Sequence, residues 1–224
     1  MVSYTLQGEA QLYFTQTQLS KFQMATHESI ITIEAGYRPG LLARCLEMHI
    51  AYYHPINSWG LVFEASVGAA WADLISRLNT NPRNQVFAAV QNSTPDDDPA
   101  AFTQKIVGTI LVDAESMKQP GMAQIRGFIV DERARGLGVG KRLLAAAMEF
   151  VEEMGFEKVS LYTARTQETS LFLYDRAGFV VVDDEEKDLW GWKMNELTLQ
   201  WTRPGAPSLR NDSLRNKEEK VTET

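Results

Sequence analysis

The stretch RARGLGVGKRLL, residues 133 to 144, combines glycines and basic residues in a pattern that can bind an anion. Glycine lets the backbone turn tightly and present consecutive N–H groups without a Cβ in the way. The leucine- and alanine-rich segment that follows predicts a helix. The first turn of such a helix adds unpaired N–H groups and the positive end of the helix dipole. A phosphate or pyrophosphate is the ligand that this chemistry favours.

The sequence does not match either of two familiar phosphate-binding motifs, because each motif needs a residue type that the sequence lacks. A Walker-type loop needs Gly where the sequence has Arg135, and Ser or Thr where it has Arg142. The dinucleotide fingerprint G-x-G-x-x-G needs a third Gly where the sequence has Lys141. A third pattern, Arg or Gln, two residues, Gly, one residue, then Gly or Ala, is met by Arg135, Gly138 and Gly140. It predicts a pyrophosphate site between a strand and a long helix, with basic side chains at its rim.

Residues able to donate or accept protons occur on both sides of this loop. Tyr174, in SLFLYDRAGF, can donate a proton, and its structural alternative is a packing tyrosine at a helix end. Glu64, in the apolar stretch LVFEAS, would become more basic on burial, which suits it to accept a proton or hold an ammonium group. A surface glutamate is an equally supported alternative. Tyr53, His54 and an ordered water are further candidates for the base.

Neither a metal site nor a reactive thiol is indicated. His49 and His54 are five residues apart, a spacing that separates them around a helix, so no metal is expected. Cys45 is the only cysteine, which excludes an intramolecular disulfide and fits a reducing, cytoplasmic compartment. A buried small hydrophobic residue is the favoured role for this cysteine.

The composition narrows the class of protein. The chain has 224 residues, 44% of them hydrophobic, and a formal net charge of −7, which is typical of a globular protein. No apolar stretch is long enough to span a bilayer, and no secretion signal is recognised. The negative charge argues weakly against a nucleic-acid partner and weakly for a cationic one. We therefore expect no nucleic-acid or membrane partner, and a homodimer is left open.

The order of predicted elements indicates an α/β fold with a mixed sheet. The predicted strands cover 29–36, 84–91, 105–114, 122–131, 157–164, 179–183 and 190–202. The predicted helices cover 38–53, 67–79, the segment from the glycine loop to residue 154, and 168–178. The charged segment 183–188 is predicted as a turn. One domain, 30–202, explains this order, with 1–29 left open and 203–224 expected as a disordered polar tail.

Three segments resemble the GCN5-related N-acetyltransferases (GNAT family). They are IRGFIVDERARGLGVGKRLL, EKVSLYTA and SLFLYDRAGFVVV, and the resemblance extends over roughly residues 30–202. It implies the GNAT-like acyl-CoA N-acyltransferase fold. In that fold a mixed, mostly antiparallel sheet is flanked by helices, and two parallel strands splay apart at the cofactor site.

The resemblance also implies roles for individual residues. Main-chain groups of Phe128, Ile129 and Val130 would pair with the pantetheine amides of acetyl-CoA, and an N–H group of this segment would meet the oxyanion. The N–H groups that would hold the pyrophosphate belong to Arg135, Gly136, Leu137, Gly138, Val139, Gly140 and Lys141. Tyr174 would protonate the departing CoA thiolate. Gln167, where the family often has Asn, would donate to the cofactor.

The expected function is acetyl-CoA-dependent acetyl transfer, directly to the primary amine of a small molecule or an amino-acid-like acceptor. One alternative is a protein N-terminal or lysine acetyltransferase. Another is a non-catalytic, acyl-CoA-binding regulatory module. Tyr174 argues against that module, while Gln167 and the unassigned base leave room for it.

Overall fold

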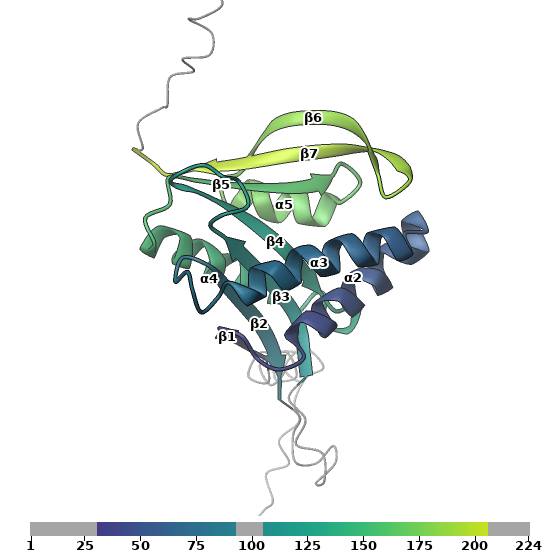
Figure 1. Ribbon diagram of the computed structural model, residues 1–224, viewed down its shortest axis with the longest axis horizontal. Helices are drawn as coiled ribbons and strands as arrows, with labels where there is room; N and C mark the ends of the chain where they lie inside the picture. The colour runs from purple at the N-terminus through teal and green to yellow at the C-terminus, as the bar shows by residue number, and fades with distance from the viewer. Residues whose placement is uncertain (1–30, 93–104, 206–224) are drawn as a thin grey trace, which may run out of the picture. The chain divides into compact units, whose positions relative to one another are not determined.

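A computed structural model describes residues 31–92 and 105–205 (Figure 1). Seven strands form one sheet in the order β1-β2-β3-β4-β5-β7-β6. The β4–β5 pair is parallel, while β1–β2, β5–β7 and β6–β7 are antiparallel. The predicted α/β fold with a mixed sheet is thus confirmed. Residues 1–30, which include the segment 1–29 that the sequence left open, lie outside the described residues, as do residues 93–104 and residues 206–224 of the expected polar tail.

The strands are β1 (Ile31–Ala35), β2 (Gln85–Gln91), β3 (Lys105–Asp113), β4 (Met122–Val130), β5 (Lys158–Ala164), β6 (Val180–Leu189) and β7 (Trp192–Thr202). The helices are α2 (Leu41–Asn57), α3 (Leu61–Ser76), α4 (Val139–Glu153) and α5 (Glu168–Arg176), with a short 3₁₀ helix, η1 (Glu132–Ala134). In the part of the chain that the structure describes, none of these helices has the length and apolar character needed to cross a membrane.

The chain divides into two compact units, and each is described by itself. Within the described residues, the first unit comprises 31–92, 105–111 and 127–147. The second comprises 112–126 and 148–205.

In the first unit, helices cover both faces of β3. The Oγ1 of Thr109 lies 3.1 Å from the Sγ of Cys45 on α2. The preceding residue, Gly108, faces α4, because a Cβ there would lie 2.9 Å from Cδ1 of Leu143. Successive strand residues point to opposite faces, so α2 and the start of α4 pack on opposite faces of β3. On the α2 side, where α3 runs beside α2 (Figure 1), the buried core includes Leu41, Met48, Trp71, Leu74, Val86, Leu111 and Ile129.

The junction between α2 and α3 differs from the prediction. The sequence predicted one helix that ends at residue 53 and a new helix from 67, but α2 continues to Asn57 and α3 begins at Leu61. Pro55 is tolerated because it lies in the last turn of α2, where its missing N–H costs one helical hydrogen bond. Three aromatic rings pack this junction, with centroids 4.8 to 5.7 Å apart: Tyr53, Trp59 and Phe63.

The second unit is built on the β5–β7 ladder, which runs from Lys158↔Thr202 to Ala164↔Glu196. Its buried side chains include Phe156, Val159, Leu161, Phe179, Leu197, Leu199 and Trp201. Arg203, which the sequence assigned to the disordered tail, is part of this unit. Its side chain donates hydrogen bonds of 2.8 to 3.3 Å to the carbonyls of residues 151, 152 and 156. These bonds satisfy carbonyl groups at and just beyond the end of α4.

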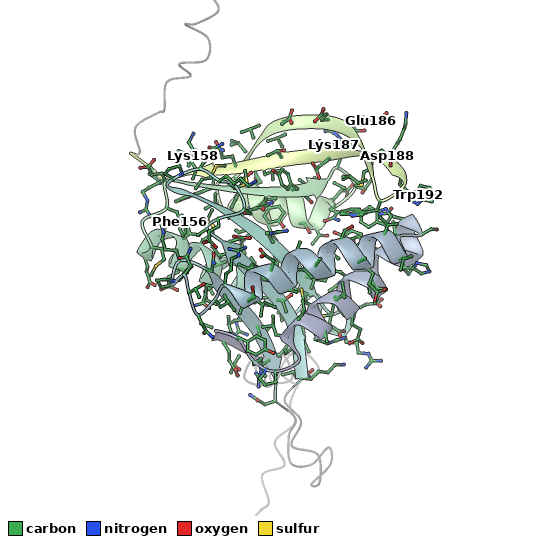
Figure 2. The ribbon with its side chains drawn as sticks, viewed as in Figure 1. Phe156, Lys158, Glu186, Lys187, Asp188 and Trp192 are labelled. Atoms are coloured by element: carbon green, nitrogen blue, oxygen red, sulfur yellow. The ribbon has the colours of Figure 1, made fainter. Side chains whose placement is uncertain are left out.

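The charged segment 183–188 is a strand, which corrects the predicted turn. The turn instead lies at Trp190 and Gly191, whose φ angles of 55° and 86° are those of a two-residue hairpin loop. Figure 2 shows Lys187 in the part of β6 next to this turn. An acidic strand is tolerated here because β6 is a solvated sheet edge, and Lys187 Nζ pairs across the ladder with Glu196 at 2.7 Å.

Candidate functional site

The glycine loop leads directly into α4. Gly136 and Gly138 have φ angles of 78° and 72°, a region that glycine adopts without steric cost. Helix α4 begins at Val139, and the N–H of Arg142 donates to the carbonyl of Gly138 at 3.1 Å. The N–H groups of residues 139–141 come before Arg142, the first residue whose N–H is bonded within the helix, so they have no acceptor in the helix. The loop therefore ends in a group of donors at the positive end of a helix dipole.

The space in front of the two glycines is open. A Cβ at Gly136 or at Gly138 would have no other atom of the described structure within 4 Å. Glycine is therefore needed there for its backbone conformation rather than for close packing. The side chains of Arg135 and Lys141 are exposed and add positive charge. Together these features are compatible with an anion, and the pyrophosphate site stays a prediction.

Asp131 fixes the start of the loop. Its N–H donates to the carbonyl of Val107 at 2.8 Å, and its carboxylate accepts from the N–H of Arg133 at 3.0 Å. The carboxylate also forms an ion pair with Arg44 and lies 3.9 Å from Lys105 Nζ. Burial by itself would raise the pKa of Asp131. The Arg133 N–H and the charges of Arg44 and Lys105 outweigh burial, so that the pKa lies below its ordinary value.

Arg135 is turned toward α2. Its Nε donates to the carbonyl of Val130 at 3.3 Å, and its guanidinium carbon lies 4.8 Å from the centroid of the Tyr52 ring. Such stacking is favourable for a partly desolvated cation. A cavity of about 560 Å³ opens at this place, and its lining includes Met48, Tyr52, Ile56, Lys105, Arg133 and Arg135.

Strand β4 is irregular just before residues 128–130, the segment expected to pair with pantetheine. Gly127 has a φ of 53°, and its carbonyl accepts a hydrogen bond of 2.8 Å from the Oγ1 of Thr109. The parallel ladder with β5 pairs only residues 122–124 with 158–160. Residues 128–130 therefore lie beyond the end of this ladder.

Tyr174 and Gln167 belong to the second unit. Tyr174 is buried in the last turn of α5, with its ring centroid 5.8 Å from that of Phe179. Gln167 is the N-cap residue of α5, and its Oε1 accepts from the Oγ1 of Thr163 at 3.2 Å. With the carbonyl oxygen so engaged, the amide nitrogen is the end of Gln167 that can donate to a ligand. The roles of both residues remain predictions.

Glu64 does not have the burial that the sequence suggested. It lies exposed in the first turn of α3, next to the buried Phe63. Neighbouring residues of a helix point to different sides, and Leu61 and Val62 of this apolar stretch are exposed as well. Of the other candidate bases, His54 places its Nδ1 2.8 Å from the carbonyl of Trp59, and Tyr53 packs at the helix junction. Whether Glu64 serves as the base is still a prediction.

Sequence reasoning missed several residues that shape this site. Asp131 carried a weak signal, since it is an acid at the junction of a predicted strand and the loop. Tyr52 and Arg44 carried none, because their partners lie about 80 to 90 positions away in the chain. The bond between Thr109 and Gly127 also carried no signal in the sequence, because it joins two different strands.

Comparison with known proteins shows which family the chain belongs to. Residues 65–179, just over half of the chain, match the family described as "Acetyltransferase (GNAT) family". The chain is similar to N-acetyltransferase family 8 member 3 of Rattus norvegicus, with 24% identity over 72% of this chain and 82% of that protein. It is also 30% identical over 83 residues to N-acetyltransferase 8B of Homo sapiens, and this match spans only 36% of that protein.

Two solved structures show the same fold. An acetyltransferase of the GNAT family from Staphylococcus aureus aligns with a TM-score of 0.56 and 18% identity, over 77% of this chain and 98% of that one. The protein yncA from Salmonella typhimurium, solved with its cofactor acetyl-CoA, aligns with a TM-score of 0.56 and 16% identity, over 77% of this chain and 93% of that one.

The matched residues contain η1, the glycine loop, α4, β5 and α5. The chain therefore belongs to the GNAT family. Its family is one of acetyltransferases, so the chain is an acyl-CoA N-acyltransferase.

Proposed function

We propose that this chain transfers the acetyl group of acetyl-CoA directly to the primary amine of a small molecule or an amino-acid-like acceptor. The observation that supports binding of acetyl-CoA is the glycine loop. Gly136 and Gly138 have positive φ angles, the space in front of them is open, and the loop leads into the N-terminus of α4. The cavity of about 560 Å³ beside Arg135 has the size of a small-molecule site, which supports a small acceptor.

Each predicted residue has a defined part in this proposal. The N–H groups of residues 136–141 hold the pyrophosphate, and main-chain groups of 128–130 pair with the pantetheine amides. The N–H of Arg135, also expected at the pyrophosphate, instead donates to the carbonyl of Glu132 at 3.2 Å, so Arg135 contributes its side chain. A main-chain N–H of 128–130 stabilises the oxyanion that forms when the amine attacks the thioester carbonyl. Tyr174 gives a proton to the leaving thiolate, Gln167 donates to the cofactor, and Glu64 holds or deprotonates the acceptor ammonium.

A panel assay tests this function. Free CoA is measured as a thiol while the full chain and acetyl-CoA are incubated with simple amines and with both enantiomers of the amino acids. A peptide with a free N-terminus and a lysine is included. Amine-dependent CoA release with a small acceptor is expected. If CoA is released only with the peptide, the acceptor is a protein and not a small molecule. If CoA is released with none of the amines, the proposal is wrong.

A cytoplasmic location and a homodimer stay predictions. Cytoplasmic location is supported by the single, buried Cys45, which fits a reducing compartment.

A further inference from the structure

Gly127 holds a backbone conformation in the middle of β4 that no other residue fits. Its φ is 53°, and a Cβ would lie 2.5 Å from Cδ1 of Leu111 and 3.3 Å from Sγ of Cys45. Its carbonyl is directed to the side chain of Thr109, with 2.8 Å between Oγ1 and the carbonyl oxygen. Thr109 is fully buried, so no water competes for this bond.

We propose that Thr109 is a positioning residue for acetyl transfer, because its hydroxyl fixes the peptide group between Gly127 and Phe128. In a planar trans peptide the carbonyl and the N–H point in opposite directions. A hydrogen bond that holds the Gly127 carbonyl toward α2 therefore also sets the direction of the Phe128 N–H. This inference rests on the proposed function, in which a main-chain N–H of residues 128–130 meets the oxyanion.

The hydroxyl of Thr109 is itself held in place. The Sγ of Cys45 lies 3.1 Å from Oγ1 of Thr109, and burial raises the pKa of the Cys45 thiol to about 12. The thiol therefore keeps its proton and can donate to the Gly127 carbonyl oxygen, which lies 3.7 Å from Sγ. The hydroxyl of Thr109 has two acceptors, this Sγ and the Gly127 carbonyl, and the bond to the carbonyl is the shorter, at 2.8 Å. The Nδ1 of His49 lies 2.8 Å from the Cys45 carbonyl and joins this network to the next turn of α2. The direction of the peptide is thus determined by side chains from α2 and β3.

The test compares Thr109→Val, which keeps the shape and removes the hydroxyl, with Thr109→Ser, which keeps the hydroxyl. Ser160→Ala is the matched control, because Ser160 is also buried and donates to a carbonyl, that of Leu199 at 3.3 Å. CoA release at saturating acceptor, acetyl-CoA affinity by calorimetry and the melting temperature are measured for each. If the main-chain N–H that stabilises the oxyanion loses its orientation, kcat falls. We therefore expect the kcat of Thr109→Val to be roughly 10- to 100-fold below that of the wild type. Acetyl-CoA affinity should change by less than about threefold, because the loss falls on the transition state.

Thr109→Ser should recover most of the kcat, and Ser160→Ala should lower only the melting temperature. If Thr109→Val does not fold, Thr109→Cys carries the test, since a thiol is a weaker donor of similar size and should give an intermediate kcat. A Thr109→Val (or Thr109→Cys) enzyme with wild-type kcat and a lowered melting temperature would overturn the inference and leave a structural threonine. Failure of the wild-type chain to release CoA with any amine would instead overturn the proposed function.

Discussion

Arg44 on α2 and Asp131 at the end of β4 form an ion pair although 87 positions separate them in the chain. Arg44 also donates through Nε to the carbonyl of Ile106 at 2.9 Å, so one side chain joins α2, β3 and the start of the glycine loop. The donors of the loop therefore depend on a residue that no motif contains.

Arg44→Gln should loosen the start of the loop. Asp131, mostly buried, loses the positive charge of its partner, and we expect about 2 kcal/mol less free energy of unfolding and a raised KM for acetyl-CoA. Denaturant unfolding and steady-state kinetics measure both. Arg77→Gln removes an arginine from an exposed helical pair with Asp73, and should change stability by less than about 0.5 kcal/mol. Equal effects of the two changes would contradict the role of Arg44.

Gly138→Ala and Gly138→Asp separate backbone strain from charge. At a φ of 72° a Cβ costs about 1 to 2 kcal/mol of stability, and the space in front of Gly138 is open. The aspartate adds a negative charge facing the pyrophosphate and should weaken acetyl-CoA binding by more than about 2 kcal/mol. Calorimetry gives the affinities. Gly155→Ala is the control, because Gly155 has a φ of 71° and open space at the end of α4. It should cost stability without affecting acetyl-CoA.

Tyr174→Phe removes a hydroxyl and keeps a ring that packs against Phe179. If the hydroxyl protonates the CoA thiolate, turnover should fall by roughly 10²- to 10⁴-fold while acetyl-CoA affinity changes little. The rate of CoA release at saturating cofactor is measured together with the melting temperature. A fall of less than about threefold with unchanged melting would remove Tyr174 from the mechanism and favour a water as the acid.

The stability of the chain should depend on pH through His49. Burial lowers the pKa of His49 from 6.5 to about 4 in the folded protein. Between these values the unfolded chain binds a proton that the folded protein does not. The free energy of unfolding therefore falls as the pH falls through this window, by roughly 2 kcal/mol between pH 7 and pH 5. Urea unfolding at both pH values should show a smaller dependence on pH for His49→Gln, and a dependence equal to that of the wild type would contradict this role of His49.

Arg203 lies near the end of the described segment 105–205. Its three hydrogen bonds to carbonyls at and beyond the end of α4 predict that Arg203→Leu lowers stability by about 1 to 3 kcal/mol. Removal of residues 206–224 should leave the melting temperature and CoA release unchanged. A chain that ends at Thr202 should melt like Arg203→Leu, and an unaltered melting temperature in that chain would show that these bonds contribute nothing.

The local features of this protein were determined by the sequence alone. The conformation of the loop depends on glycines at 136 and 138 and on the helix that starts beside them, and both effects act within a few residues. The strands β2, β3, β4 and β5 were predicted close to their observed limits, because buried strands form apolar runs with recognisable boundaries. The conformation of the glycine loop was therefore predictable from its own residues.

The tertiary structure decided what depends on contacts between distant residues. The predicted turn at 183–188 is a strand because β7 pairs with it at a solvated sheet edge, where charged side chains cost little. Glu64 is exposed because α3 begins six residues earlier than the pattern indicated, at a junction packed by the Trp59 and Phe63 rings. The bond from Thr109 to Gly127 requires β3 beside β4, and the pair of Arg44 with Asp131 requires α2 beside both. Such bonds join residues whose types give no signal until the chain has folded, because their effect comes from proximity and burial rather than from local pattern.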